Sequence, residues 1–232
     1  MAHPPFRVIL ADAVSRALSY EQLVPQLEDA FRAFSARDGS VQQPRRSVLP
    51  LEEHGGVLCI LGAGKQAESH YYALMSVHKF NEVRLWSRTR ESCECLVSRL
   101  PPGIQICPDA ESAVCGADVV VTVTMAMEPI LKGCWIKPGA HINVVGACRP
   151  NWREVDDDAM RGCTLYVDDA EAARNESGDV MLSGAKIFAE LGEVISGRKP
   201  SLKDHTTIFK SLGLAFQDAV AAKIVYDNLK DN

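Results

Sequence analysis

A glycine-rich turn stands directly after an apolar run, where its backbone could hold a phosphate group. The run covers residues 57–61 and leads into Gly62 and Gly64. In a strand-to-helix turn the first glycine allows a tight bend, the second lets a pyrophosphate approach, and a small third residue allows close helix–strand packing. The unpaired N–H groups and the dipole of the helix N-terminus favour an anion. The pattern predicts a dinucleotide-binding loop made of Gly62, Ala63, Gly64, Lys65, Gln66 and Ala67, with a glycine turn that binds nothing as the alternative.

A second group of polar residues follows the next expected strand, at residues 82–86. Ser87, Arg88 and Thr89 stand there, and the first carboxylate is Glu91. Sites selective for NAD carry an Asp or Glu about 20 residues after the glycine loop, on the ribose 2′-hydroxyl. Arg88 can instead pair with a 2′-phosphate, to which Ser87 and Thr89 can donate hydrogen bonds. We therefore expect NADP(H) to be preferred over NAD(H). The alternative is a solvated basic helix start, which the helix dipole disfavours.

These two groups require a sheet whose strand ends lie side by side. Strands are expected at residues 57–61, 82–86, 104–107, 118–123 and 141–145, and helices at 65–78, 90–100 and 110–115. Strands that alternate with helices through short loops predict an α/β fold with a Rossmann-type doubly wound sheet. We assign residues 57–205 to this NADP-binding domain.

The flanking segments follow a different pattern. Leu23, Leu27 and Phe31 recur at helical spacing, and Pro25 fits the first turn of that helix. Residues 47–51 suggest a short strand, and residues 211–229 suggest a long amphipathic helix. One helix and one strand cannot bury their apolar faces unaided. We therefore expect residues 1–56, with about 206–232, to be the remnant of a truncated second domain.

Bulk properties narrow the partners and the compartment. The formal charge of −5 gives no reason to expect nucleic acid or an acidic membrane as a partner. The N-terminus lacks the apolar core of a signal peptide. The most apolar stretch, residues 119–127, is too short to span a bilayer and contains Thr122 and Thr124. These features favour a cytoplasmic protein.

Cysteine and histidine usage points the same way. The eight cysteines include no CxxC pair, so we expect reduced and mostly buried thiols rather than disulfides. The six histidines are scattered and none pairs with another ligand at zinc-site spacing, so no metal site is predicted.

Six separated blocks resemble the ornithine cyclodeaminase/mu-crystallin family. They lie, in the family's order, at residues 57–64, 86–89, 122–125, 139–147, 176–180 and 209–213. The resemblance implies an NADP(H)-dependent reductase of cyclic ketimines that bear a carboxylate, of the piperideine or pyrroline carboxylate type, acting as a cytosolic homodimer. It also implies an alternative, an NADP(H)-regulated protein that binds the thyroid hormone triiodothyronine without turnover.

The resemblance assigns further site residues. Arg46 matches the residue that holds the substrate carboxylate, although without the family it would read as an exposed strand charge. Glu176 matches the position that faces the imine or the amino group of the hormone. The positions near the nicotinamide half of the cofactor are Val123, Thr124, Met125, Val145 and Ser211.

The chain departs from the family in two places. The cyclodeaminase branch carries an acidic residue just after the strand that ends at Gly146, where this chain has Ala147 and Cys148. This difference favours the reductase branch. Family members also carry a long stretch between the positions of Gly56 and Val57, which includes the lysine thought to act at the imine. The resemblance therefore implies an internal deletion and no catalytic residue among those present.

The expected deletion has consequences for rate and stability. The loss of an acid–base group removes about 10² to 10⁴ in rate. We therefore expect weak or absent turnover, and a chain that does not fold stably is the remaining alternative.

Overall fold

The computed structural model describes residues 11–36 and 55–230 of the 232. Its centre is one sheet of parallel strands in the order β3-β2-β1-β4-β5-β8-β6-β7. The strands are β1 (Gly56–Leu61), β2 (Phe80–Trp86), β3 (Ile104–Ile106), β4 (Val119–Thr122), β5 (His141–Val144), β6 (Thr164–Val167), β7 (Ile187–Glu190) and β8 (Thr207–Lys210). The doubly wound α/β fold expected from the alternating pattern is confirmed.

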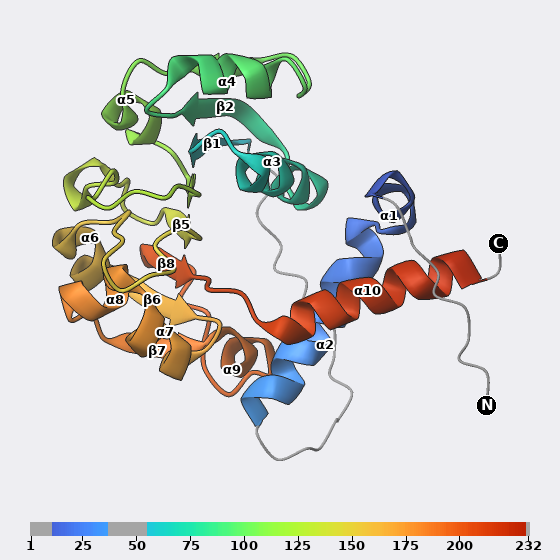
Figure 1. Ribbon diagram of the computed structural model, residues 1–232. Helices are drawn as coiled ribbons and strands as arrows, with labels where there is room; N and C mark the ends of the chain where they lie inside the picture. The colour runs from blue at the N-terminus through green and yellow to red at the C-terminus, as the bar shows by residue number, and fades with distance from the viewer. Residues whose placement is uncertain (1–10, 37–54, 231–232) are drawn as a thin grey trace.

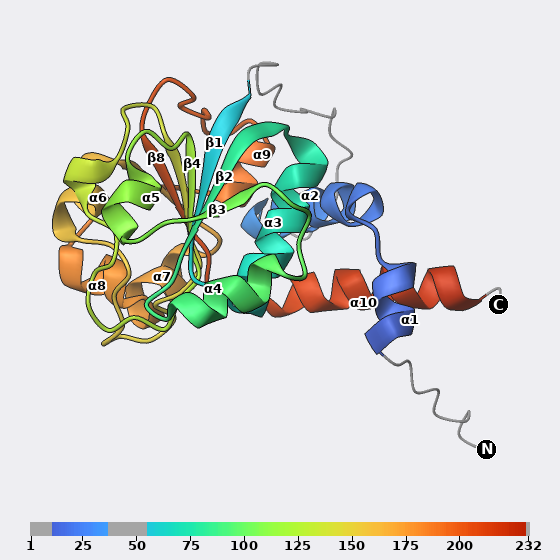
Figure 2. The same cartoon turned by 90° about the horizontal axis from the view of Figure 1, so that it is seen from above.

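Helices cover both faces of this sheet (Figure 2). Those after β1 are α3 (Lys65–Val77), α4 (Arg90–Val97), α5 (Ala110–Val114), the 3₁₀ helix η1 (Gly133–Trp135), α6 (Asp157–Gly162), α7 (Ala170–Glu176), α8 (Gly178–Ser183), α9 (Leu191–Ile195) and α10 (Ala215–Lys230). Before β1 lie α1 (Ala11–Ala17) and α2 (Tyr20–Ala36).

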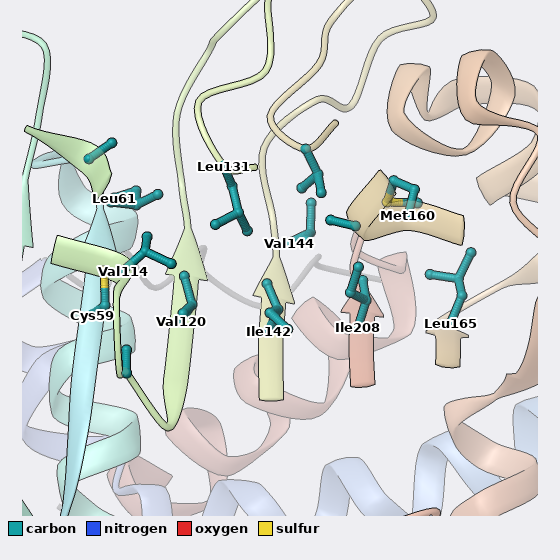
Figure 3. Packing of buried hydrophobic residues seen from close by; sticks show 14 of the residues in the cluster. Cys59, Leu61, Val114, Val120, Leu131, Ile142, Val144, Met160, Leu165 and Ile208 are labelled. Atoms are coloured by element: carbon teal, nitrogen blue, oxygen red, sulfur yellow. The ribbon is translucent and has the colours of Figure 1, made fainter. Parts of the chain in front are cut away.

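Strand β1 shows how the apolar run produces two cores. Its side chains alternate between the faces of the sheet, as they must in any strand. Leu58 and Ile60 pack with α3 and α4, whereas Cys59 and Leu61 pack with α5, α6 and α8. Figure 3 shows the second cluster, in which neighbouring strands present Val120, Ile142 and other apolar side chains in a row. Burial on both faces explains why this strand is continuously hydrophobic.

The N-terminal helices dock on the C-terminal part of the chain. Helix α2 lies against α9 and α10, and Figure 1 shows α1 and α2 beside α10, which extends away from the sheet. The Phe31 and Phe216 rings stack edge to face, with centroids 5.1 Å apart. Ser35 Oγ donates to a Glu190 carboxylate oxygen at 3.1 Å. Adding a Cβ to Gly192 would bring it within 2.1 Å of the Phe31 carbonyl, so this contact requires glycine.

Two expectations about the flanking segments need correction. Pro25 lies inside α2, as its sixth residue, rather than in the first turn. The C-terminal helix begins at Ala215 rather than at residue 211, after an irregular segment in which Gly213 has φ 87°. A strand, β8, follows the expected domain boundary at about residue 206 and lies between β5 and β6. The strand expected at residues 47–51 lies outside the described residues.

The thiols are less buried than expected. All eight cysteines are free, but only Cys59, Cys93 and Cys107 are buried, and four are exposed. The expectation of mostly buried thiols is therefore wrong. Among the described residues no helix is both long and apolar enough to cross a membrane. In the same part of the chain no three His, Cys, Asp or Glu side chains gather to hold a metal ion.

Candidate functional site

The order of the strands reverses at one point along the sheet, between β1 and β4. The chain winds outward from β1 through β2 to β3, and then returns to β4 on the other side of β1. Parallel α/β sheets bind ligands where the strand order reverses in this way. Gly62 follows β1 and Val123 follows β4, so both stand at this point.

Gly62 sits between the ends of two strands. Its φ is 124°, and a Cβ added there would lie 2.7 Å from the Val123 carbonyl oxygen. Its N–H donates to the Trp86 carbonyl at 2.8 Å, which joins the glycine turn to the end of β2. The tight bend expected at Gly62 is therefore present, and it brings the residues after β2 next to the loop.

Gly64 differs from Gly62 in its surroundings. It is the N-cap of α3, with φ −92°, and no side chain caps the helix there. Among the described residues, no atom beyond the adjacent backbone lies within 4 Å of the position where a Cβ would stand, so the described part of the chain leaves this space open. Ala67, one turn further on, is fully buried against β1, whereas the Lys65 side chain is 91% exposed. First-turn N–H groups beside open space can hold an anion.

The residues after β2 provide positive charge beside that space. Ser87 is half-buried, Arg88 and Thr89 are exposed, and Thr89 is the N-cap of α4 without a capping side-chain bond. Arg90 pairs with Glu94 at 3.0 Å. Within the part of the chain that the structure describes, Arg88 forms no ion pair. Its guanidinium is therefore available to an anionic ligand, whereas that of Arg90 is already engaged.

The predicted positions of the other half of the site lie at the ends of β4, β5 and β8. The Val145 N–H donates to the Thr122 carbonyl at 2.9 Å, and the Ser211 N–H donates to the Val144 carbonyl at 3.0 Å. Met125 extends into solvent with 78% exposure. The structure thus brings Val123, Thr124, Val145 and Ser211 to adjacent strand ends.

Four charged residues that the sequence analysis missed lie beneath this edge. Glu154, Asp168, Asp179 and Lys210 are all fully buried. The Glu154 carboxylate accepts hydrogen bonds from Thr122 Oγ1 at 2.7 Å, from Thr124 Oγ1 at 2.6 Å and from the Thr124 N–H. The Lys210 ammonium donates to the Gly146 carbonyl oxygen.

The two other acids hold backbone segments. One Asp168 oxygen accepts from the N–H groups of Leu212 and Gly213, each at 2.7 Å. One Asp179 oxygen accepts from the N–H groups of Glu154 and Val155, at 2.8 and 3.0 Å. Carboxylates that accept backbone N–H bonds satisfy donors that a turn leaves without a strand partner.

Burial dominates the electrostatics of this group. It raises the pKa of Glu154 above the ordinary value, although the threonine hydrogen bonds and the positive charge of Lys210 oppose the change. Burial also raises the pKa of Asp179, against the charge of Lys210 and the bonds to the two N–H groups. A signal for two of these residues was present in the sequence, because Asp168 and Lys210 directly end or follow short strands, β6 and β8, that were not recognised.

Of the two residues assigned to the substrate, the structure describes only Glu176. Glu176 is exposed at the end of α7. The next helix begins at Gly178, whose N–H donates to the Arg149 carbonyl in the loop after β5. Arg46 lies outside the described residues.

Three comparisons place this geometry among known proteins. A sequence model of the ornithine cyclodeaminase/mu-crystallin family matches residues 53–232. Ketimine reductase mu-crystallin from Mus musculus is 62% identical over 172 residues, covering 74% of this chain and 55% of the mouse protein. The structure of Thermococcus litoralis delta(1)-pyrroline-2-carboxylate reductase in complex with NADH and L-proline has a TM-score of 0.73 at 31% identity, covering 78% of this chain and 60% of that chain.

An archaeal alanine dehydrogenase dimer with bound NAD is also similar, with a TM-score of 0.81, 23% identity and 95% coverage of both chains. At that identity the likeness concerns the fold alone. The chain spans about half the length of the curated relatives it matches, 55% in the case of the mouse protein. The family match extends over most of the chain, and it includes the glycine turn, the Arg88 segment and the buried charges. The chain belongs to the ornithine cyclodeaminase/mu-crystallin family.

Proposed function

We propose that this chain binds a nicotinamide dinucleotide across the carboxyl ends of β1 and β4. The observation that carries the proposal is the uncapped N-terminus of α3, with open space at Gly64 and the exposed guanidinium of Arg88 nearby. The pyrophosphate binds at the first turn of α3, where the N–H groups and the helix dipole favour it. The adenosine half then extends toward β2, and the nicotinamide half toward β4 and β5.

We further propose that NADP(H) is preferred over NAD(H). Support comes from Arg88, Ser87 and Thr89, which stand where NAD-selective sites carry an acid. The Thermococcus relative holds NADH in its structure, so the preference is a property of these residues rather than of the family.

The test replaces Arg88 by alanine and uses Arg90→Ala as the matched control. A charge-assisted hydrogen bond contributes about 1.5–3 kcal/mol, which corresponds to about 10- to 100-fold in affinity. Titration of tryptophan fluorescence should show that Arg88→Ala weakens NADPH binding by that factor and changes NADH binding less than about twofold. Arg90→Ala should leave both affinities unchanged, because Arg90 is paired with Glu94. Equal losses for the two cofactors in Arg88→Ala would contradict the proposal.

For the whole protein we propose the reduction of cyclic imines that bear a carboxylate. The names of the relatives, a ketimine reductase and a pyrroline-2-carboxylate reductase, support this substrate class. A bound reduced nicotinamide supplies a hydride to the carbon of a C=N bond. The protein must also hold the carboxylate, for which we propose Arg46, place Glu176 near the imine, and deliver a proton to the nitrogen.

For the last of these tasks, the delivery of a proton to the nitrogen, we assign no residue in this chain. We propose that a segment with the family's lysine is absent between Gly56 and Val57. At that junction the register between β1 and β2 is irregular, since Gly56 pairs with Phe80 and Val57 with Glu82. Turnover should then fall by about 10² to 10⁴ relative to a chain with that lysine. A steady-state assay with pyrroline-2-carboxylate and NADPH tests this, and turnover equal to that of the mouse protein would contradict it.

The remaining proposals concern partners and location. The eight free cysteines support a reducing compartment such as the cytoplasm. Homodimerisation is a proposal that sedimentation velocity tests, because a monomer at micromolar concentration would contradict it. Triiodothyronine binding without turnover is the alternative function. It requires that NADPH change the affinity for the hormone, which a binding titration with and without NADPH measures.

A further inference from the structure

The turns after three adjacent strands are each fixed by a fully buried charged side chain. Glu154 holds the turn after β4, Lys210 the turn after β5, and Asp168 the turn after β8. These strands are the first three beyond the point where the strand order reverses. On the other side, the ends of β1 and β2 are joined by backbone, through Gly62 N–H and the Trp86 carbonyl.

Glu154 is the central member of this arrangement. It reaches the turn after β4 from the loop between β5 and α6, and its two oxygens bind Thr122 and Thr124. Its own backbone N–H is held by Asp179, so the acid cannot shift without breaking a second buried bond. Thr124 therefore has its N–H and its hydroxyl fixed by one rigid acceptor.

Gly146 shows how closely these parts fit. A Cβ added to Gly146 would lie 2.2 Å from the Thr124 carbonyl oxygen and 2.4 Å from the Glu154 carboxyl carbon. The turn after β5 thus packs directly on the turn after β4, with the Glu154 carboxylate between them. Lys210 donates a hydrogen bond to the carbonyl of Gly146. A displacement of Glu154 would therefore move both turns.

A buried carboxylate fills space at a higher cost in free energy than an apolar side chain of the same volume. Removing an ion from water costs several kcal/mol unless hydrogen bonds and opposite charge compensate, and an apolar side chain often fills the same volume with equal or greater stability. What the carboxylate adds is directional acceptors that specify one conformation of residues 122–124. The buried carboxylate therefore fixes the conformation of these residues and does not add to the stability of the fold.

We propose that Glu154 is a positioning residue for the nicotinamide half of the cofactor. The inference rests on the proposed function, which places that half over the ends of β4 and β5. Glu154 is fully buried and does not touch the cofactor. It acts through Thr124, by holding residues 123–125 in the conformation that contacts the nicotinamide ribose. The adenosine half, over β1 and β2, does not depend on Glu154.

The experiment compares two ligands on the full chain. NADPH contains both halves of the cofactor, whereas adenosine 2′,5′-bisphosphate contains only the adenosine half. The variant Glu154→Gln keeps the size of the side chain but removes its charge and one acceptor. The matched control is Asp118→Asn, an acid-to-amide change next to the other end of β4, where Asp118 binds the Val57 N–H at 2.8 Å. Affinities are measured by calorimetric titration.

We expect Glu154→Gln to weaken NADPH binding by about tenfold or more and to change the affinity for the bisphosphate less than about twofold. Asp118→Asn should leave both affinities within about twofold. Equal losses for the two ligands, or no loss for either, would overturn the inference while the proposed function stands. A wild-type chain that binds neither ligand would overturn the proposed function itself. If Glu154→Gln does not fold, Thr122→Val removes one hydroxyl bond to Glu154 from a residue not assigned to the cofactor. It should show the same selectivity, with a loss of about threefold for NADPH.

Discussion

Gly62→Ala and Gly64→Ala should affect different properties, stability and cofactor affinity respectively, although the two glycines are only two residues apart. Gly62 has φ 124° and a Cβ there would stand 2.7 Å from the Val123 carbonyl oxygen. Gly64 has φ −92°, and no atom of the described, non-adjacent residues lies within 4 Å of its Cβ position. Gly62→Ala should therefore damage the fold, whereas Gly64→Ala should leave the fold intact and obstruct the cofactor.

The magnitudes follow from these surroundings. A residue forced into a sparsely populated backbone region costs about 1–3 kcal/mol, and overpacking against a fixed backbone atom costs a similar amount. The free energy of unfolding of Gly62→Ala should fall by roughly 2–5 kcal/mol, and the Tm by roughly 5–15 °C. At the N-cap, alanine in place of glycine costs less than about 1 kcal/mol. Its methyl group would occupy the space that the pyrophosphate requires, so NADPH affinity should fall at least about tenfold.

Urea denaturation and NADPH titration on both variants measure the two quantities separately. Gly62→Ala should show the stability loss, and Gly64→Ala should show a loss of affinity with nearly wild-type stability. Wild-type NADPH affinity in Gly64→Ala would refute the placement of the pyrophosphate at α3. Wild-type stability in Gly62→Ala would refute the close packing between the glycine turn and the end of β4.

Three further perturbations test other parts of the structure. Ile208→Ala, in the fully buried centre of β8, should lower the free energy of unfolding by about 2–5 kcal/mol in urea, whereas Val77→Ala, 61% exposed, should change it by less than about 0.5 kcal/mol. Because burial raises the pKa of Glu154 above its ordinary 4.5, wild-type stability is lost as the pH rises through the raised value. Glu154→Gln lacks this titration, so its stability deficit should be larger at pH 4 than at pH 8, and the reverse trend in urea unfolding would contradict the raised pKa. Mass spectrometry after brief alkylation should find Cys134 modified and Cys59 unmodified until the chain is unfolded, since Cys134 is exposed and Cys59 fully buried with a raised pKa.

The glycine turn and the residues after β2, where we propose that the adenosine half of the cofactor binds, could be predicted from the sequence because their signals are local. The apolar run, the glycine turn and Ala67 are contiguous, and their conformation is set by residues within one turn of each other. Ser87 and Arg88 follow directly from the end of the next strand. The structure confirms the strand, the turn and the helix that position these residues.

The other half depends on long-range order that no periodicity reveals. Strands β6, β7 and β8 have only four residues each, and their register in the sheet joins segments far apart in the chain. Glu154 acts on Thr124 across 30 positions, and Asp168 acts on Gly213 across 45. From the sequence alone, a charged residue in a short segment is interpreted as part of a solvent-exposed loop, because its distant hydrogen-bond partner is not known.

The predicted position of Pro25 in the first turn of its helix is wrong for a related reason. Local rules allow proline in the first turn, because an interior proline removes one backbone hydrogen bond. Helix α2 nevertheless begins at Tyr20 and continues through Pro25 to Ala36. Tertiary contacts account for this, since Phe31 is buried against α10 and Ser35 binds Glu190. Packing with distant segments outweighs the local preference.

The most direct test of the account is amide hydrogen exchange on the full chain with and without saturating NADPH. We expect slower exchange at residues 62–67, at 87–89 and at 123–125, because these segments follow the carboxyl ends of β1, β2 and β4. The N-terminal ends of the strands, such as residues 118–119 and 141, should be unaffected. No change in exchange on addition of NADPH, or slower exchange only away from the carboxyl edge of the sheet, would contradict the central claim that this chain carries a dinucleotide site at that edge.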